Sequence, residues 1–256
     1  MSAVVEFIHV SKRYRLWSRQ GGGLKSMLLT PRLAREVIRE SYHLVLDDIN
    51  FSIQDGESVA IIGRNGAGKS TLLSLLAGVL RPSSGKVITR GRVAGMLELG
   101  AGFHPELTGR ENIRLNATLL GLRQKEIDRA MPDIIAYADI GRFIEEPVRI
   151  YSSGMLARLG FAVISQISPD ILLIDEVLAV SDQAFRQKCL ATLRQFQQRG
   201  VTLLMVSHNP SDISAFCNQV LWFENHRLYA SGTPQELLPR YQHALMDPTG
   251  NSKAKE

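Results

Sequence analysis

A glycine-rich segment at residues 63–70 has the residue types and spacing of a phosphate-binding loop. It reads Gly-Arg-Asn-Gly-Ala-Gly-Lys-Ser, that is, a glycine, four residues and then Gly-Lys-Ser. Its glycines let backbone N–H groups converge on phosphate oxygens, and the apolar run that follows predicts a helix whose N-terminus favours anions. Lys69 is expected to neutralise the β- and γ-phosphates of a nucleotide, and Ser70 to coordinate Mg²⁺. The residues expected to contact the nucleotide here are Gly63, Arg64, Asn65, Gly66, Ala67, Gly68, Lys69, Ser70 and Thr71.

Two carboxylates follow an apolar run at residues 171–174 that predicts a buried strand. Because neighbouring side chains on a strand point in opposite directions, Asp175 and Glu176 need different roles. We expect Asp175 to be an outer-sphere or water-mediated ligand of Mg²⁺. Glu176 is expected to polarise the water that attacks the terminal phosphate. Strands ending in Asp-Glu are common, so it is the phosphate-binding loop that makes this prediction specific.

A second candidate for phosphate binding is the turn Ser152-Ser153-Gly154, which opens a predicted helix over residues 155–165. Hydroxyls, free N–H groups and the helix dipole favour an anion at such a turn. Taken alone, the same residues fit an ordinary helix N-cap equally well. Because Lys69 already accounts for the near side of the nucleotide, we expect this turn to contact a nucleotide held by another subunit.

His208 ends another predicted strand, at residues 202–206. Parallel strands place their carboxyl ends at one edge of a sheet, so His208 is expected to lie beside the phosphate-binding loop and to reach the γ-phosphate. Lys69, Glu176 and His208 are therefore the predicted catalytic side chains. The remaining histidines have no such placement and are interpreted as surface or core residues: His9, His43, His104, His226 and His243.

Alternating strands and helices must position these residues, and such alternation predicts an α/β fold with a mostly parallel sheet. Besides the strands named above, strands are expected at residues 4–10, 44–53, 58–62 and 219–223, and helices at about 182–198 and after Pro210. Residues 86–96 are interpreted as a hairpin broken at Gly91. Residues 104–167 read as a helical insert: Thr108 and Glu111 form a capping box, and helices follow at 125–138 and 155–165.

Composition is that of an ordinary globular chain. The 256 residues are 45% hydrophobic and 21% charged, enough for one large domain or two small ones. No apolar run is long enough to span a membrane, and the N-terminus lacks the features of a signal peptide. Cys189 and Cys217 lack metal-ligand spacing and suggest free thiols in a reducing compartment, so we expect a cytoplasmic location.

The net charge of +5 comes from the first 42 residues, which hold eight Lys and Arg against three Glu. Thr30 and Pro31 predict the start of a short helix with Arg32, Arg35 and Arg39 on one face. A basic arm on a neutral body indicates an anionic surface nearby, either nucleic acid or lipid headgroups. A solvated basic face is the simpler alternative.

The ordered set of motifs resembles the ABC ATPase family over nearly the whole chain. The resemblance rests on the phosphate-binding loop, the Ser-Ser-Gly turn, Asp175-Glu176 and His208, in that order. It implies a P-loop ABC ATPase domain with a mostly parallel core sheet, an antiparallel β subdomain and a helical insert. It also implies ATP and Mg²⁺ as ligands. A head-to-tail homodimer is implied too, in which each ATP lies between one subunit's loop and the other's Ser152-Ser153-Gly154.

Further site residues follow from the resemblance alone. Tyr14 looks like the aromatic residue that stacks on adenine, and residues 179–182 look like the loop that links the two sites. The family's usual signature is Leu-Ser-Gly-Gly-Gln, whereas this chain has Tyr-Ser-Ser-Gly-Met, which keeps Ser152 and Gly154. Where the family places a glutamine before the helical insert, the equivalent residue is Glu98, whose carboxylate can also ligate Mg²⁺.

These departures resemble the ATP-binding subunits of polysaccharide exporters for O-antigen, capsule and related lipid-linked glycans; teichoic-acid exporters are close relatives. Such a subunit docks on a separate multi-span membrane permease at the cytoplasmic face of the bacterial inner membrane. The expected domain is 1–246, with a basic insert at about 18–43, a helical subdomain at about 104–167 and a polar tail at 247–256. Some members carry a C-terminal glycan-binding domain, for which we expect no room here.

Two alternatives remain open. The first is a soluble ABC ATPase acting on nucleic acid or ribosomes, which the basic arm allows. Such proteins usually carry two ATPase units or a very long coiled-coil insert, so we expect no nucleic-acid partner. The second is the ATPase of an importer or of a small-molecule exporter, which would share the mechanism and differ in cargo.

Overall fold

The structure is a computed structural model that describes residues 2–15, 42–96, 102–175 and 182–246. Three groups of predicted residues lie outside these ranges. They are the arginines of the basic insert, the carboxylates Glu98 and Glu176, and residues 179–181 of the linking loop. The expected polar tail, 247–256, lies outside them as well.

A six-stranded sheet forms the centre of the chain, in the order β5-β6-β7-β3-β8-β9. Its strands are β3 (Ser58–Gly63), β5 (Val93–Met96), β6 (Ile171–Asp175), β7 (Thr202–Val206), β8 (Gln219–Glu224) and β9 (Arg227–Gly232). All neighbouring pairs are parallel except β8 with β9. The prediction of a mostly parallel core sheet is therefore confirmed.

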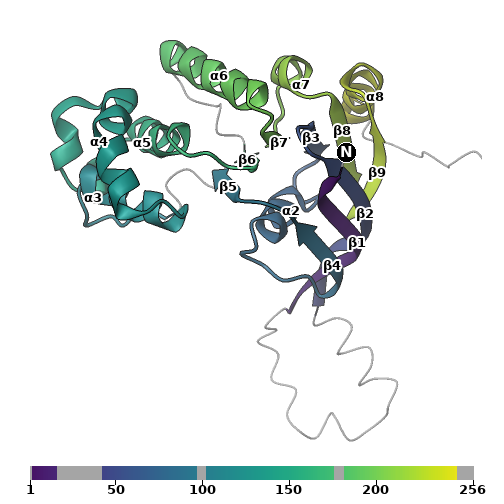
Figure 1. Cartoon of the computed structure of the whole chain (residues 1–256). Coiled ribbons are helices and arrows are strands. Elements are labelled where there is room, and N and C mark those ends of the chain that lie inside the picture. The colour runs from purple at the N-terminus through teal and green to yellow at the C-terminus, as the bar shows by residue number, and fades with distance from the viewer. Residues whose placement is uncertain (1, 16–41, 97–101, 176–181, 247–256) are drawn as a thin grey trace, which may run out of the picture.

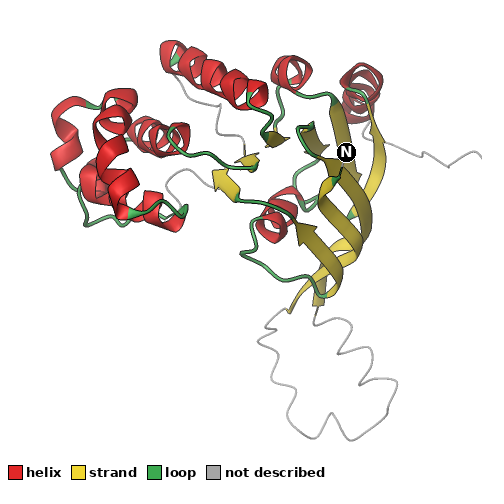
Figure 2. Ribbon diagram, viewed as in Figure 1, coloured by secondary structure: helices red, strands yellow, loops and turns green. Residues whose placement is uncertain are grey.

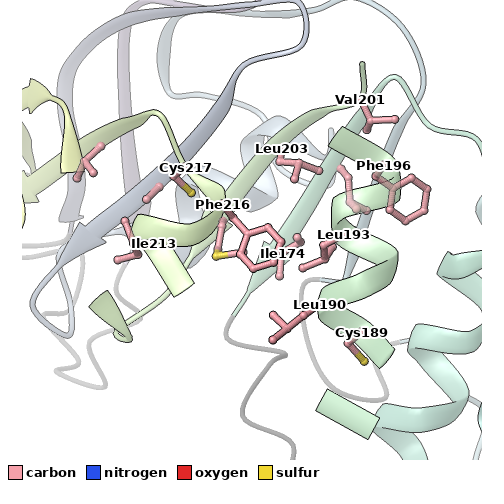
Figure 3. Packing of buried hydrophobic residues seen from close by; sticks show 14 of the residues in the cluster. Ile174, Cys189, Leu190, Leu193, Phe196, Val201, Leu203, Ile213, Phe216 and Cys217 are labelled. Atoms are coloured by element: carbon pink, nitrogen blue, oxygen red, sulfur yellow. The ribbon is translucent and has the colours of Figure 1, made fainter. Parts of the chain in front are cut away.

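Both faces of this sheet are covered, which explains why the inner strands β3 and β7 are buried along their whole length and are mostly apolar. On one face, Ile62, Ile174 and Leu203 pack against helices α6 (Gln183–Gln198), α7 (Pro210–Phe216) and α8 (Pro234–Met246). Figure 1 shows these three helices along the same side of the sheet. Leu190 and Leu193 of α6 meet the strands in the close view of Figure 3.

The opposite face packs against helix α2 (Lys69–Leu76) and a second, three-stranded sheet. That sheet has the order β2-β1-β4 and is antiparallel, with strands β1 (Ala3–Arg15), β2 (Tyr42–Gln54) and β4 (Ser84–Thr89). Alternation along the central strands explains the division: Ile61 and Leu173 point to this side, whereas Ile62 and Ile174 point to the other. The expected antiparallel β subdomain is confirmed.

Between β5 and β6 the chain forms a helical lobe, which we define as residues 109–165. It contains α3 (Gly109–Leu119), α4 (Gln124–Ala138), two 3-10 turns, η2 (Gly141–Glu145) and η3 (Val148–Ile150), and α5 (Ser153–Ser165). Figures 1 and 2 show this lobe beside the sheets and built of helices and loops. Its own apolar core includes Ile113, Ile134 and Leu159. In the described ranges, no helix is long and apolar enough to cross a bilayer.

The capping box at the start of α3 is confirmed. The Thr108 hydroxyl accepts from the Glu111 backbone N–H at 3.2 Å, and the Thr108 N–H donates to the Glu111 carboxylate at 2.9 Å. The Glu111 carboxylate therefore has its pKa lowered, chiefly by that backbone N–H of Thr108.

The predicted hairpin over residues 86–96 is wrong, because its two strands belong to different sheets. β4 pairs antiparallel with β1, whereas β5 pairs parallel with β6. Between them, the Arg92 backbone N–H donates to the Asp170 carboxylate at 2.6 Å and the Arg92 carbonyl accepts from the Asp170 N–H at 3.0 Å. These bonds direct the chain after Gly91 towards β6.

The sequence analysis predicts no helix or strand at residues 225–246, which contain β9 and α8. The β8–β9 turn has Asn225 and His226 at positive φ, 47° and 68°, a conformation typical of two-residue hairpin loops. At the start of α8, the Thr233 N–H donates to Glu236 Oε2 at 3.0 Å and Pro234 stands at the first helical position.

Cys189 and Cys217 are both buried free thiols of the α6 and α7 side of the core, as Figure 3 shows. Burial raises the pKa of each thiol to about 12. Since the thiolate is the reactive form, we expect neither cysteine to react with a disulfide reagent such as dithionitrobenzoate at pH 8 in the folded protein. Both should react promptly in denaturant. Rapid labelling of the folded chain would contradict this packing.

Candidate functional site

The glycine-rich loop connects β3 to α2, and its glycines are required by the geometry. Gly66 and Gly68 have φ of 82° and 96°, where residues with a side chain are strained. A Cβ on Gly68 would lie 2.7 Å from both Leu46 Cδ2 and the Val45 carbonyl. The backbone therefore runs close against β2 as it enters α2. This conformation fits the expected cradle of N–H groups for phosphate oxygens.

Lys69, the first residue of α2, is 8% exposed and lies over this loop. Its ammonium donates to the Gly63 carbonyl at 2.7 Å and to the Arg64 carbonyl at 3.2 Å. These are neutral acceptors on the loop that would surround a phosphate chain. Phosphate oxygens are stronger acceptors for an ammonium, so the same side chain can transfer to them.

The carboxyl ends of three neighbouring strands meet beside the loop. In the sheet register, Asp175 of β6 pairs with Val206 of β7, and Val206 pairs with Ile61 of β3. Ser207 and His208 follow β7 directly, and His208 is exposed whereas Ser207 is buried. The structure thus brings Asp175 and His208 to the sheet edge from which the loop leaves.

Ser152 is the N-cap of α5, and its hydroxyl accepts from the Met155 N–H at 3.2 Å. Ser152 and Ser153 are exposed, and a Cβ on Gly154 would meet nothing nearer than Ser152 Oγ at 3.8 Å. Across the described ranges, no hydrogen bond joins this turn to the glycine-rich loop, and Figure 1 shows α5 in the helical lobe, apart from α2. An open helix start of this kind can receive a phosphate from another molecule.

Tyr14 lies near the end of β1, next to the start of α2. Its hydroxyl is 3.5 Å from Thr71 Oγ1, and the Lys12 ammonium lies 5.2 Å from the ring centroid. With 37% of the residue exposed, the ring has a face available to a purine beside the loop. The placement fits the adenine contact that resemblance implies.

Metal ligation at the site would depend on the nucleotide as well as on the protein. In the part of the chain that the structure describes, no three His, Cys, Asp or Glu side chains are grouped to hold an ion. Ser70 stands in the first turn of α2 and Asp175 at the adjacent strand end. One hydroxyl and one carboxylate, with phosphate oxygens and waters, are a donor set typical of Mg²⁺.

Arg158 is a residue that the sequence reasoning missed. It lies on α5, four positions after Gly154, and its guanidinium pairs with the Asp182 carboxylate and with Asp139 Oδ2 at 3.5 Å. It also lies 4.7 Å above the Phe185 ring. Arg158 therefore ties the Ser-Ser-Gly helix to the start of α6. An arginine one helical turn beyond the turn residues was the available signal.

Asp182 serves two purposes in this link. As the N-cap of α6 its Oδ1 accepts from the N–H groups of Ala184 and Phe185, at 2.9 and 3.4 Å. Its pKa is lowered chiefly by the Phe185 N–H, and also by the Ala184 N–H and the Arg158 guanidinium. The carboxylate thus stays ionised at neutral pH and holds both the helix start and the arginine.

Replacing Arg158 with Ala is expected to uncouple α5 from α6. We expect ATP turnover to fall roughly tenfold, equivalent to about 1.4 kcal/mol, because the turn and the linking loop lose their common anchor. Arg158→Lys should restore little, since an ammonium cannot hold both carboxylates and stack on Phe185. Steady-state ATPase assays with Arg129→Ala, an exposed arginine of α4, provide the control. Equal rates for the two alanine variants would refute the coupling role.

The ABC transporter family model matches residues 46–179 of this chain. The chain belongs to the ABC transporter family. The O-antigen export system ATP-binding protein RfbB of Klebsiella pneumoniae is 55% identical over 245 residues, which span 96% of this chain and 100% of that protein. The teichoic acids export ATP-binding protein TagH of Listeria monocytogenes is 40% identical over 93% of this chain and 69% of TagH.

Solved structures show the same fold. A post-hydrolysis dimer of the ATP-binding cassette MJ0796 bound to ADP and Pi has a TM-score of 0.70 at 20% identity, covering 90% of this chain and 98% of that one. An ATP-binding subunit of an ABC transporter has a TM-score of 0.72 at 23% identity, covering 93% of each chain. The expected ABC ATPase is therefore confirmed, whereas the roles given to individual site residues stay predictions.

Proposed function

We propose that this chain is the ATP-hydrolysing subunit of an exporter that moves a lipid-linked polysaccharide, such as O-antigen, across the inner membrane. The observation that carries the proposal is the near full-length similarity to two Klebsiella proteins named as O-antigen export ATP-binding proteins, at 55% and 54% identity. Relatives named for teichoic acid export are less similar, at 37–40%. Because teichoic acids are polymers too, both sets favour a glycan or related polymer as cargo.

The site residues support a division of labour in hydrolysis. Lys69 and the loop N–H groups bind the β- and γ-phosphates, and Glu176 orients a water and accepts its proton as the water oxygen attacks the γ-phosphorus. The bond from the γ-phosphorus to the bridging oxygen breaks, leaving ADP and inorganic phosphate. His208 donates a hydrogen bond to the γ-phosphate. Ser70, and Asp175 through a water, would hold Mg²⁺, which would supply neutralisation of the charge that develops on the phosphates.

A dimer completes the site in this proposal. Within one chain the Ser-Ser-Gly turn stands open and apart from the glycine-rich loop. In a head-to-tail pair, Ser152 of the partner subunit faces the γ-phosphate held by the first subunit's loop. ATP binding then closes the pair, and hydrolysis removes the phosphate that joins the two surfaces. A separate membrane-spanning permease converts closing and opening into export, with this chain bound at its cytoplasmic face.

A genetic test separates export of a glycan from other transport. Deleting the gene for this chain should remove the polysaccharide from the cell surface and make the lipid-linked polymer accumulate on the cytoplasmic side. Expression of the wild-type chain should restore the surface polymer, whereas Lys69→Met should not. Unchanged surface polymer, with lost uptake of a small solute instead, would show that the cargo assignment is wrong.

The basic insert gives a further prediction. Changing Arg32, Arg35 and Arg39 together to Gln should leave basal ATPase close to wild type and weaken the stimulation by permease in anionic lipid, because the headgroup contacts are lost. The control carries Gln at three exposed arginines elsewhere: Arg123, Arg129 and Arg199. Equal loss of basal and stimulated activity would instead indicate a folding role for the insert.

A further inference from the structure

The last turn of α8 is bound to the glycine-rich loop. Arg64, the first residue after β3, donates from Nη2 to the Ala244 carbonyl at 2.7 Å. Carbonyls in the last turn of a helix lack partners within the helix, and a cation there is favoured by the helix dipole. The bond therefore joins two segments that are 180 positions apart in the sequence.

A second contact region lies one turn earlier on α8. Tyr241 is buried, and its ring packs edge-on to Trp222 of β8, with centroids 5.3 Å apart. Trp222 pairs with Ile62, the residue before Gly63, in the parallel ladder of β3 and β8. Burial raises the pKa of Tyr241, and the Arg64 charge and the Gly63 backbone oppose that shift. The phenol thus lies beside the first residues of the loop.

Within the loop, Arg64 is connected to the side chain that is to bind phosphate. Its carbonyl accepts from the Lys69 ammonium at 3.2 Å and from the Ala67 N–H at 3.1 Å. The Arg64 side chain is fixed by α8, while its backbone fixes the turn that presents Lys69. A continuous path of bonded groups therefore runs from Ala244 to Lys69.

We propose that the last turn of α8 is a positioning element for the phosphate-binding loop and that Arg64 is its positioning residue. By holding Arg64, α8 orders the first half of the loop before ATP arrives, so less ordering is required during binding and the affinity for ATP is higher. This inference rests on the proposed nucleotide-binding function. The competing interpretation is a surface hydrogen bond that only fastens α8.

Leu245 offers a way to break the contact in the full chain. Proline at position 245 would push Ala244 out of the helical conformation and turn its carbonyl away from Arg64. Leu245 is 47% exposed, so loss of its side chain costs little packing. Leu245→Ala keeps the helix and is the matched control. Arg64→Ala removes the same bond from the other side.

The experiment measures binding of MgATP by titration with a fluorescent ATP analogue, and the Michaelis parameters of ATP hydrolysis. Leu245→Pro and Arg64→Ala should each raise Kd and KM about fivefold, the loss expected for one hydrogen bond, with kcat little changed. The double variant should bind MgATP no more weakly than either single variant, because the two substitutions remove the same bond. Leu245→Ala should bind as wild type does.

Two outcomes overturn the inference while leaving the proposed function intact. One is equal ATP affinity for Leu245→Pro and Leu245→Ala. The other is a double variant whose Kd rises by the product of the two single increases, which would show that the two substitutions act independently. A purely structural role predicts a lower thermal midpoint for Leu245→Pro with unchanged KM. Failure of the wild-type chain to bind MgATP would instead overturn the proposed function and, with it, this inference.

Discussion

Replacing Glu176 with Gln is expected to abolish ATP turnover while leaving ATP binding intact. The amide has nearly the same shape as the carboxylate and cannot accept the proton of the attacking water. Loss of a general base typically reduces a rate by about 10²–10⁴-fold. Because the nucleotide contacts remain, we expect MgATP to hold the variant as a closed dimer. ATPase assays together with size-exclusion chromatography in MgATP measure both effects.

Glu106→Gln is the control for this variant. Glu106 is a solvent-exposed carboxylate that lies 3.5 Å from Arg149, and such surface pairs contribute little. The Glu106→Gln variant should hydrolyse ATP as wild type does and should not accumulate as a dimer. Hydrolysis by Glu176→Gln at the wild-type rate would show that the role assigned to Glu176 is wrong.

Removing the ammonium of Lys69 should have the second largest effect, on binding. Methionine keeps the apolar stem at this buried position but cannot donate to phosphate. Charge-assisted hydrogen bonds contribute about 1.5–3 kcal/mol each, so the loss of two would weaken MgATP binding at least about 100-fold. Titration with a fluorescent ATP analogue measures the change directly.

Lys69→Arg tests whether charge alone is enough. A planar guanidinium is longer than an ammonium and does not fit between the Gly63 and Arg64 carbonyls as the ammonium does, so we expect binding to stay weak. Lys125→Met, at an exposed lysine of α4, controls for the loss of one positive charge. If Lys69→Met bound MgATP as tightly as this control does, the proposed contact between Lys69 and phosphate would be wrong.

Much of the central sheet could be predicted from local sequence. Apolar runs of four residues predict buried strands, and the helix signals at Thr108, Ser152 and Asp182 mark real helix starts. The glycine-rich loop could be recognised because phosphate binding requires this spacing of the glycines, Lys69 and Ser70. Parallel order then placed His208 at the same edge, as the register of β7 confirms.

What escaped prediction depended on contacts between distant segments. Residues 86–96 hold two short apolar stretches on either side of Gly91, and nothing within them shows that β4 pairs with β1 while β5 pairs with β6. The pairing of β5 with β6 is accompanied by the bond of Arg92 to Asp170, a residue far along the chain. Periodicity describes which face of a strand is buried, not which strand lies beside it.

Several site assignments have the same limit. The bonds of Arg158 to Asp182 and of Arg64 to the Ala244 carbonyl could not be predicted, because only the fold brings these groups together. Tyr14 was found by resemblance, and its neighbour Thr71 becomes evident only in the structure. Glu98 and Glu176 lie outside the described residues and rest on the sequence alone.

The most direct test of an export motor is ATPase activity in a reconstituted membrane. Wild-type and Glu176→Gln chains are assayed alone, and with the multi-span permease proposed as their partner in lipid vesicles, with and without lipid-linked glycan. We predict wild-type activity that rises with the membrane protein and rises further with the glycan, and no activity for Glu176→Gln. Wild-type activity that changes with neither the membrane protein nor the glycan, but increases with nucleic acid, would contradict the account.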